Sequence, residues 1–151
     1  MKNMYQSWLF QTNPDHHEFA CIRRTSCNQY NWIVKEHRDD IKLGDRVFIW
    51  KASGKKREVR GIVGHGKIAG PLRSIEHHSG LSCWKKEHGA TVEIAIGDLT
   101  ILREADWITT AKLEDHLILK DWAKRSWRGT NFKITNKQAD CLEEMIRHIN
   151  E

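Results

Sequence analysis

Residues 41–51, IKLGDRVFIWK, give the clearest secondary-structure signal in the chain. Ile41–Asp45 predicts a turn, because Gly44 and Asp45 are turn formers. The four apolar residues Val47–Trp50 that follow are β-branched or aromatic, which is typical of a strand. The stretch therefore predicts a turn that leads directly into a strand of a β-sheet.

The next segments extend this strand into a hairpin. Ala52–Glu58 is a polar, basic loop, and Val59–Leu72 reads as a second strand that contains Gly61, Gly64 and Gly66. Glycine inside a strand indicates a bulge or a close approach of another backbone. The order G-x-x-G-x-G is neither the dinucleotide-binding motif nor a P-loop, so it argues against a nucleotide-binding fold.

The remaining elements complete an α+β pattern. Thr135–Gln138 is a capping box, and it opens a terminal helix with an apolar stripe. Extended segments are expected at Met4–Phe10, Trp32–Val34 and Ala90–Ile101, and a loop that runs into a short strand at Gly129–Ile134. A short helix is expected over Asp15–Arg24, and short helical pieces over Glu104–Trp127. The predicted fold class is α+β: a small, curved or closed mixed β-sheet, like a barrel, surrounded by short helices and a C-terminal helix.

Length and hydropathy give the broad class. The chain has 151 residues, which fits a single domain over residues 1–151. No apolar run exceeds four residues, far below the roughly 20 that a membrane-spanning helix needs. The N-terminus has no apolar segment typical of a secretory signal, so a cytoplasmic protein with no membrane partner is expected.

Basic residues concentrate in two windows. Lys51–Arg73 holds seven basic residues and one acidic residue, and Lys120–Lys137 holds six and one, although the whole chain carries only +5. Such a distribution predicts a localised positive face that attracts polyanions, above all nucleic acid. The alternatives are a solvated surface that keeps the protein soluble, and a face that docks an acidic protein.

Tryptophan is unusually frequent, with seven residues. Trp32 follows a polar loop and Trp50 ends the strand beside Lys51, so two indoles at strand ends are placed to clamp a base flipped out of its stack. Polar side chains of Gln11–Asn13 would test the edge of that base. The competing interpretation is that both indoles belong to the core.

Five segments spread over the chain form a specific combination. They are Trp8-Leu9-Phe10-Gln11-x-Asn13-Pro14, then Trp32, then Ile41-x-x-Gly44-Asp45-x-Val47-Phe48-Ile49-Trp50-Lys51, then Arg60-Gly61-Ile62-Val63-Gly64-x-Gly66-x-Ile68, and Gly129-Thr130-x-Phe132-x-Ile134-Thr135. Together they resemble the EVE domain of the PUA-like superfamily, which is similar to the YTH domain. The resemblance implies a strongly curved sheet ringed by helices and a non-catalytic pocket for a modified base of DNA or RNA.

The resemblance also implies roles for residues. Trp32 and Trp50 would line the pocket, and no cofactor is expected. The rim and one side of the pocket would be formed by Asn13, Lys51, Ala52, Ser53, Gly129, Thr130 and Phe132. The nucleic-acid backbone would lie on Lys55, Lys56, Arg57, Arg60, Arg125 and Arg128. A separate effector protein is a possible partner, and the loop over residues 74–89 departs from the family pattern.

Two other chemistries remain as alternatives. PUA-like folds include small amidohydrolases acting on modified nucleosides through a lysine and a carboxylate, for which Lys51 with Glu58, or Lys67 with Glu93, are the candidate pairs. Zinc ligands cluster within twelve residues at His77, His78, Cys83 and His88, but adjacent histidines cannot easily chelate one ion, so no metal is expected. The four cysteines form no C-x-x-C motif and are expected to be reduced thiols.

Overall fold

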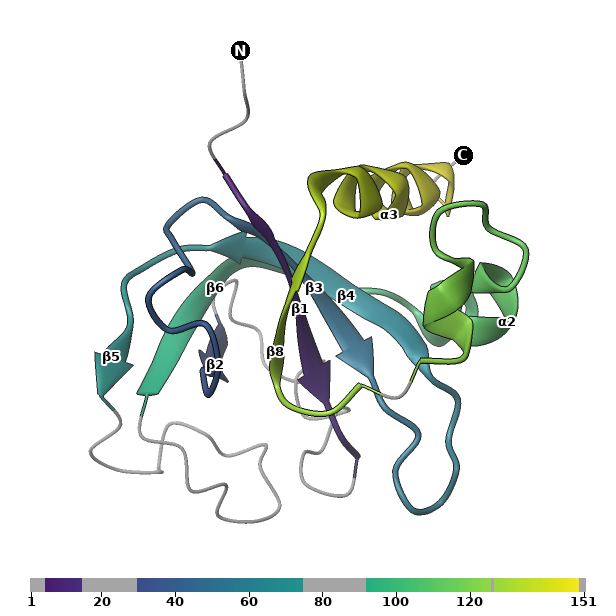
Figure 1. Ribbon diagram of the computed structural model, residues 1–151, viewed down its shortest axis with the longest axis horizontal. Coiled ribbons are helices and arrows are strands. Elements are labelled where there is room, and N and C mark those ends of the chain that lie inside the picture. The colour runs from purple at the N-terminus through teal and green to yellow at the C-terminus, as the bar shows by residue number, and fades with distance from the viewer. Residues whose placement is uncertain (1–4, 15–29, 75–91, 126, 150–151) are drawn as a thin grey trace.

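The computed structural model describes residues 5–14, 30–74, 92–125 and 127–149, which are coloured in Figure 1. The strands are β1 (Ser7–Thr12), β2 (Tyr30–Ile33), β3 (Arg46–Lys51), β4 (Gly61–Ile68), β5 (Arg73–Ser74), β6 (Val92–Ile101), β7 (Ile108–Thr109) and β8 (Asn131–Ile134). The helices are the short η2 (Glu104–Asp106), α2 (Thr110–Leu113) and η3 (Lys120–Ala123), and the long α3 (Asn136–Ile149).

These strands form one mixed sheet in the order β2-β6-β4-β3-β1-β8, with β5 beside β6 and β7 beside β4. β1 and β3 run parallel, from Ser7 opposite Arg46 to Thr12 opposite Lys51. The backbone N–H of Ala52 then donates to the carbonyl of Thr12 at 2.8 Å. Both strands therefore end at the same edge of the sheet, the lower edge in Figure 1.

A buried asparagine joins the two end strands of this order. Asn131, the first residue of β8, is 1% exposed, and its side-chain Nδ2 donates to the carbonyl of Ile33 in β2 at 3.1 Å. Its Oδ1 accepts from the backbone N–H of Lys35 at 2.8 Å. The sheet thus curls until its ends meet, which confirms the predicted curved α+β architecture.

Glycine in β4 permits close packing, as the sequence predicted. A Cβ on Gly66 would lie 2.8 Å from the carbonyl oxygen of Gly97 in β6, closer than real Cβ atoms approach. The pairing of β4 with β6 also shifts register between His65 and Lys67. The missing side chain therefore allows a bulge where the sheet bends.

The terminal helix α3 begins at the predicted capping box. Thr135 Oγ1 accepts from the N–H of Gln138 at 3.0 Å, and Gln138 Oε1 accepts from the N–H of Thr135 at 2.9 Å. Arg46, at the start of β3, donates to Asp140 at 2.7 Å and to Glu143 at 3.1 Å. The helix is thus fastened at the end of the sheet opposite the edge where β1 and β3 finish (Figure 1).

Several boundaries differ from the prediction. β1 continues through Gln11 and Thr12, expected to break it, because Gln11 pairs with Trp50 and donates its N–H to the Thr130 carbonyl. The two-residue strands β5 and β7 had no sequence signal.

Some predicted segments lie outside the described residues: the helix expected at Asp15–Arg24, and residues 75–89 of the loop that departs from the family pattern. Within the described ranges, no helix is both long and apolar enough to cross a bilayer.

Candidate nucleic-acid interface

The edge where β1 and β3 end gathers most of the predicted pocket residues. Asn13 follows β1, and Ala52 and Ser53 follow β3; all three are half-buried. Thr130 reaches the same edge, since its carbonyl accepts from the N–H of Gln11 at 2.8 Å. The parallel pairing of β1 with β3 therefore brings together residues about 40 positions apart in sequence, and the antiparallel pairing of β1 with β8 adds Thr130, about 80 positions further on.

The side chain of Lys51 turns into the β3–β4 loop, whereas the family resemblance implied only its backbone at the pocket rim. Its side chain is buried, and its Nζ donates to the carbonyl of Val59 at 3.0 Å and pairs with Glu58 at 3.4 Å. The ammonium also lies 5.6 Å from the ring centre of Trp107. Lys51 therefore closes the β3–β4 loop from inside, and this loop carries the exposed Lys55, Lys56 and Arg57 outward.

Arg60 connects the two basic windows. Its Nη2 donates to the carbonyl of Ala123 at 2.7 Å and its Nη1 to the carbonyl of Arg125 at 3.1 Å. These bonds place the β3–β4 loop beside the segment that leads into β8. Two donors of Arg60 are thus used on backbone oxygens, and its predicted phosphate contact stays a prediction. The exposed cations of the two segments that this contact joins are Lys55, Lys56, Arg57, Lys124, Arg125 and Arg128.

Aromatic rings pack directly behind this basic surface. Trp127 contacts Phe132 at 4.9 Å, Trp122 at 5.5 Å and Trp50 at 5.8 Å between ring centres. The guanidinium carbon of Arg125 lies 3.9 Å from the ring centre of Trp127. The structure therefore places a four-ring cluster, Trp50, Trp122, Trp127 and Phe132, next to exposed positive charge.

The two indoles predicted to form a slot are both in the core. Trp32 and Trp50 are each 0% exposed. Trp50 packs on Trp122 of η3, because η3 covers that face of β3. Trp32 packs beside Tyr30, at 5.9 Å between ring centres. Among the described residues, neither indole opens to solvent, so the open slot expected between them is not seen.

Glycine 129 brings a carboxylate against the loop that precedes β8. It has φ +119°, which a residue with a side chain rarely adopts, and a Cβ there would collide with Glu36 Oε1. That oxygen accepts from the N–H of Thr130 at 2.8 Å. Gln11 holds the loop from the other side, since its Nε2 donates to the carbonyls of Trp127 at 3.1 Å and Gly129 at 2.8 Å.

Two buried polar atoms near Gly129 have no hydrogen-bond partner within the part of the chain that is described: Glu36 Oε2, an acceptor, and Trp127 Nε1, a donor. An unsatisfied buried group costs about 1–3 kcal/mol, so such atoms mark a place where a ligand can compensate. Neither residue was predicted. Glu36 and Trp127 carry no local motif, and only the tertiary contacts with Gly129 and Phe132 reveal them.

Tyr30, the first residue of β2, stays neutral over the ordinary pH range. Burial raises the pKa of its phenol to about 12, because the phenolate would lose its hydration. Its hydroxyl is therefore a possible donor as well as an acceptor at physiological pH.

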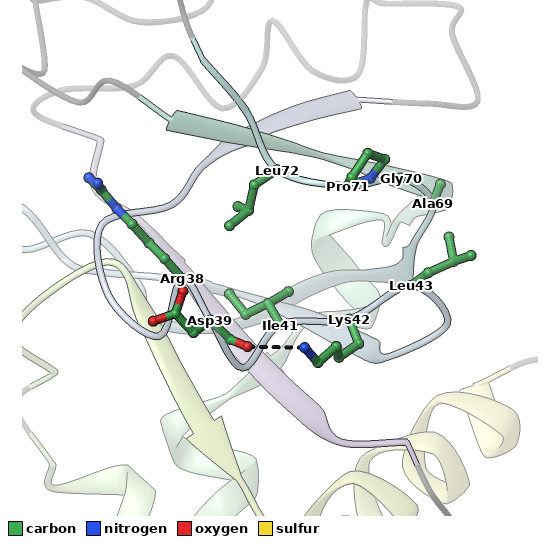
Figure 2. Close-up of a pocket in the computed structure, with 9 residues that line it drawn as sticks. All are labelled: Arg38, Asp39, Ile41, Lys42, Leu43, Ala69, Gly70, Pro71 and Leu72. Carbon is green, nitrogen blue, oxygen red and sulfur yellow. Dashed lines mark hydrogen bonds between the residues drawn. The ribbon is translucent and has the colours of Figure 1, made fainter.

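The pocket in Figure 2 lies elsewhere on the molecule. It encloses about 640 Å³ between the β2–β3 loop and the β4–β5 connection. Its lining residues are Arg38, Asp39, Ile41, Lys42, Leu43, Ala69, Gly70, Pro71 and Leu72. This lining contains no aromatic ring on which a base would stack and none of the predicted site residues. Another pocket, of about 510 Å³, includes Ser53 and Arg60 and so adjoins the basic loop.

The alternative chemistries have one geometric counterpart here. Lys51 and Glu58 are indeed paired, whereas Glu93 pairs with Arg73 at 2.6 Å and not with Lys67. The described residues contain no group of three potential metal ligands. The cluster His77, His78, Cys83 and His88 lies outside them, as do all cysteines except the half-buried free thiol Cys141.

Comparison with known proteins identifies the family. The family model for the EVE domain matches residues 6–145, so the chain belongs to the EVE domain family. Its curled sheet with peripheral helices is the PUA-like fold that the sequence predicted. No curated protein matches the chain by sequence.

Solved structures share this fold at low sequence identity. Protein PSPTO5229 from Pseudomonas syringae has a TM-score of 0.62 at 18% identity, over 93% of this chain and 99% of that chain. A hypothetical protein from Leishmania major has a TM-score of 0.63 at 12% identity, over 97% and 98%. Human THYN1, in complex with DNA that contains 5-methylcytosine, has a TM-score of 0.58 at 14% identity, over 93% and 97%.

Proposed function

We propose that this protein is a non-catalytic nucleic-acid-binding module that reads a modified base in DNA or RNA. The observation that carries the proposal is the contact between the two basic windows through Arg60, directly beside the ring cluster around Trp127. Positive charge binds the phosphate backbone and aromatic rings stack on bases, so their juxtaposition suits a polynucleotide. Family membership and the human THYN1 complex with 5-methylcytosine DNA support the same reading.

The modified base is proposed to enter at the edge where β1 and β3 end. Glu36 Oε2 and Trp127 Nε1 supply a buried acceptor and a buried donor beside Gly129. A base edge offers both donors and acceptors, so it satisfies both atoms. Asn13 and Ser53 flank this edge. In this proposal Trp50 supports the Trp127 ring by packing against it.

Binding to matched oligonucleotides tests the proposal. The probes are single- and double-stranded DNA with one 5-methylcytosine or one cytosine, and the corresponding RNA, titrated at several salt concentrations. We expect a preference for one modified probe and an affinity that falls as salt rises. Equal binding to all probes and to heparin, or no binding at low salt, would refute a modified-base reader.

A matched pair of variants locates the phosphate face. Replacing Lys55, Lys56 and Arg57 together by Ala removes three contacts, so the slope of log affinity against log salt should fall by up to about 2.7. The control replaces Arg38 and Lys42, which line the pocket in Figure 2, by Ala. This control also removes positive charge but should leave the slope nearly unchanged, because neither residue belongs to the two basic windows.

A second candidate function is hydrolysis of a modified nucleoside, which the Lys51–Glu58 pair favours. Incubation with modified nucleosides, followed by mass analysis of the products, separates the two functions. Turnover by the wild type that disappears in Lys51→Met and in Glu58→Gln would support the hydrolase. No product under conditions in which oligonucleotides bind would support the reader.

A further inference from the structure

We propose a second base-binding site, formed by Trp127 and Arg125, that clamps one unpaired nucleobase next to the modified one. The inference rests on the proposed function, since the ligand is a polynucleotide. The base would stack on the indole face of Trp127 and be covered by the guanidinium of Arg125. It shares Trp127 with the edge at Gly129 and Glu36: in this proposal the indole N–H bonds the modified base there, whereas the indole face stacks on the neighbouring base.

The present contact between the two side chains already has the form of a closed clamp. The Arg125 guanidinium carbon lies 3.9 Å from the ring centre of Trp127. Arg125 is exposed, whereas Trp127 is only 8% exposed. The guanidinium is planar and itself stacks on bases, so a base can enter between two groups that both have stacking faces.

The ring of Trp127 is held rigidly, and only the side chain of Arg125 that covers it is free to move. Trp127 is held by its rings' contacts with Trp122 and Phe132, and Gln11 holds its carbonyl. The backbone carbonyl of Arg125 is fixed by Arg60. Opening the clamp therefore requires rotation of one exposed side chain and no displacement of the fold.

The surrounding charge defines the class of ligand. Lys124 and Arg128, on either side of the Arg125–Trp127 pair, are exposed and basic. They suit the two phosphates that flank one nucleotide. A base inside a duplex has both faces covered by its stacked neighbours, so only a base that has left the stack can enter. The site thus takes a nucleotide of a single-stranded or locally opened segment.

Abasic substitutions in the oligonucleotide test the clamp. Binding is measured with the preferred modified probe and with versions in which one neighbouring nucleotide at a time lacks its base. For the wild type, we expect one neighbouring position at which base removal weakens binding about 5- to 150-fold, the loss of one stacking contact. In Arg125→Ala the same removal should cost less than about 3-fold.

Three variants separate stacking from charge. Arg125→Lys keeps the charge, so its salt slope should equal that of the wild type while its sensitivity to the abasic position falls. Lys124→Ala removes one charge, so its slope should fall by about 0.9 with full sensitivity retained. Trp127→Phe keeps a ring and should retain part of the sensitivity; its circular dichroism and melting verify folding.

The outcomes distinguish this site from the proposed function. If the wild type binds and prefers a modified probe, but no neighbouring abasic position weakens binding, the clamp is wrong and the reader stands. If Arg125→Ala and Lys124→Ala behave alike, with the abasic penalty unchanged, Arg125 is a phosphate contact and the clamp is again wrong. If the wild type binds no probe, both proposals fall.

Discussion

Individual basic residues have different roles in this protein, which depend on the groups that their charged side-chain atoms contact. Lys51 directs its ammonium inward to Val59 and Glu58, and Arg60 spends two donors on backbone carbonyls. Arg125 instead lays its guanidinium on an indole. Charge counting alone would treat the three as equivalent, but only the exposed guanidinium of Arg125 is placed to meet a ligand directly.

At the residue scale, Gly129→Ala is expected to destabilise the protein by about 1–3 kcal/mol, because a φ of +119° strains a residue with a Cβ and Glu36 would be displaced. Urea unfolding measures the loss. The matched control is Gly70→Ala, where the nearest atom to a new Cβ is 3.9 Å away, and its effect should stay within about 0.5 kcal/mol. Similar losses in both variants would contradict the role assigned to Gly129.

Among the elements, two contacts position the site: the pairing of β1 with β3, and the packing of η3 over β3. The parallel pair sets Asn13 and Ala52 at one edge, while η3 buries Trp50 from outside. Arg60, just before β4, then fastens the segment after η3 to the β3–β4 loop. The basic face therefore depends on contacts between elements, and each can be tested separately.

Arg60→Ala should lower the free energy of unfolding by about 1–2 kcal/mol, because it removes two hydrogen bonds from a charged group. It should also reduce the salt slope of oligonucleotide binding by more than the roughly 0.9 of one lost charge, since Arg125 and Arg128 would lose their fixed position. Arg103→Ala, at an exposed ion pair with Asp106, is the control and should change stability by less than about 0.5 kcal/mol. A slope change equal to one charge would make Arg60 an ordinary phosphate contact.

We expect the free energy of unfolding to depend on pH through His65 in β4, which interacts with Glu143 of α3. Burial lowers the pKa of its imidazole below 6.5, and the carboxylate of Glu143 in α3 partly opposes this shift. The unfolded chain therefore binds more protons in acid, so this contribution to stability is full above pH 6.5 and is lost as pH falls through the lowered pKa. His65→Gln should flatten the decline of unfolding free energy between about pH 7 and 5; an unchanged profile would show that His65 does not couple to folding.

At the scale of the whole molecule, one side chain closes the curl of the sheet. Asn131 bonds Ile33 and Lys35 across the two end strands, and Glu36 lies next in the chain with its carboxylate at Gly129. The curvature thus carries the candidate site, because β2 and the loop before β8 meet only when the ends of the sheet approach. Loss of the Asn131 hydrogen bonds should therefore affect both the stability of the protein and its nucleic-acid binding.

Asn131→Ala is expected to cost about 2–4 kcal/mol in unfolding free energy, since it leaves several buried backbone groups without partners. Hydrogen exchange should become faster for the backbone amides of Lys35 and Glu36, which donate to Asn131 Oδ1. Thr100→Ala, at an exposed position of β6, is the control and should leave both measurements nearly unchanged. Protected amides at these two positions in Asn131→Ala would contradict the closing role.

Much of the architecture was predictable because its signals are local. The apolar run Val47–Trp50, the glycines of β4 and the capping box at Thr135 each depend on neighbours in sequence, and each was found in its place. The family was likewise carried by spaced motifs. The extension of β1 through Thr12 was missed, because its last hydrogen bonds go to Thr130 and Ala52, which no local pattern reveals.

The α+β class, the order of the main elements, the family and the two basic windows all follow from the amino-acid sequence. Contacts made on folding bring those windows together through Arg60, close Trp32 and Trp50 to solvent, and set Glu36 against Gly129. The physical reason is that burial and hydrogen bonding are set by pairs far apart along the chain, such as Gln11 with Gly129. A residue's type fixes what it can bind, and the fold fixes which of its atoms remain available.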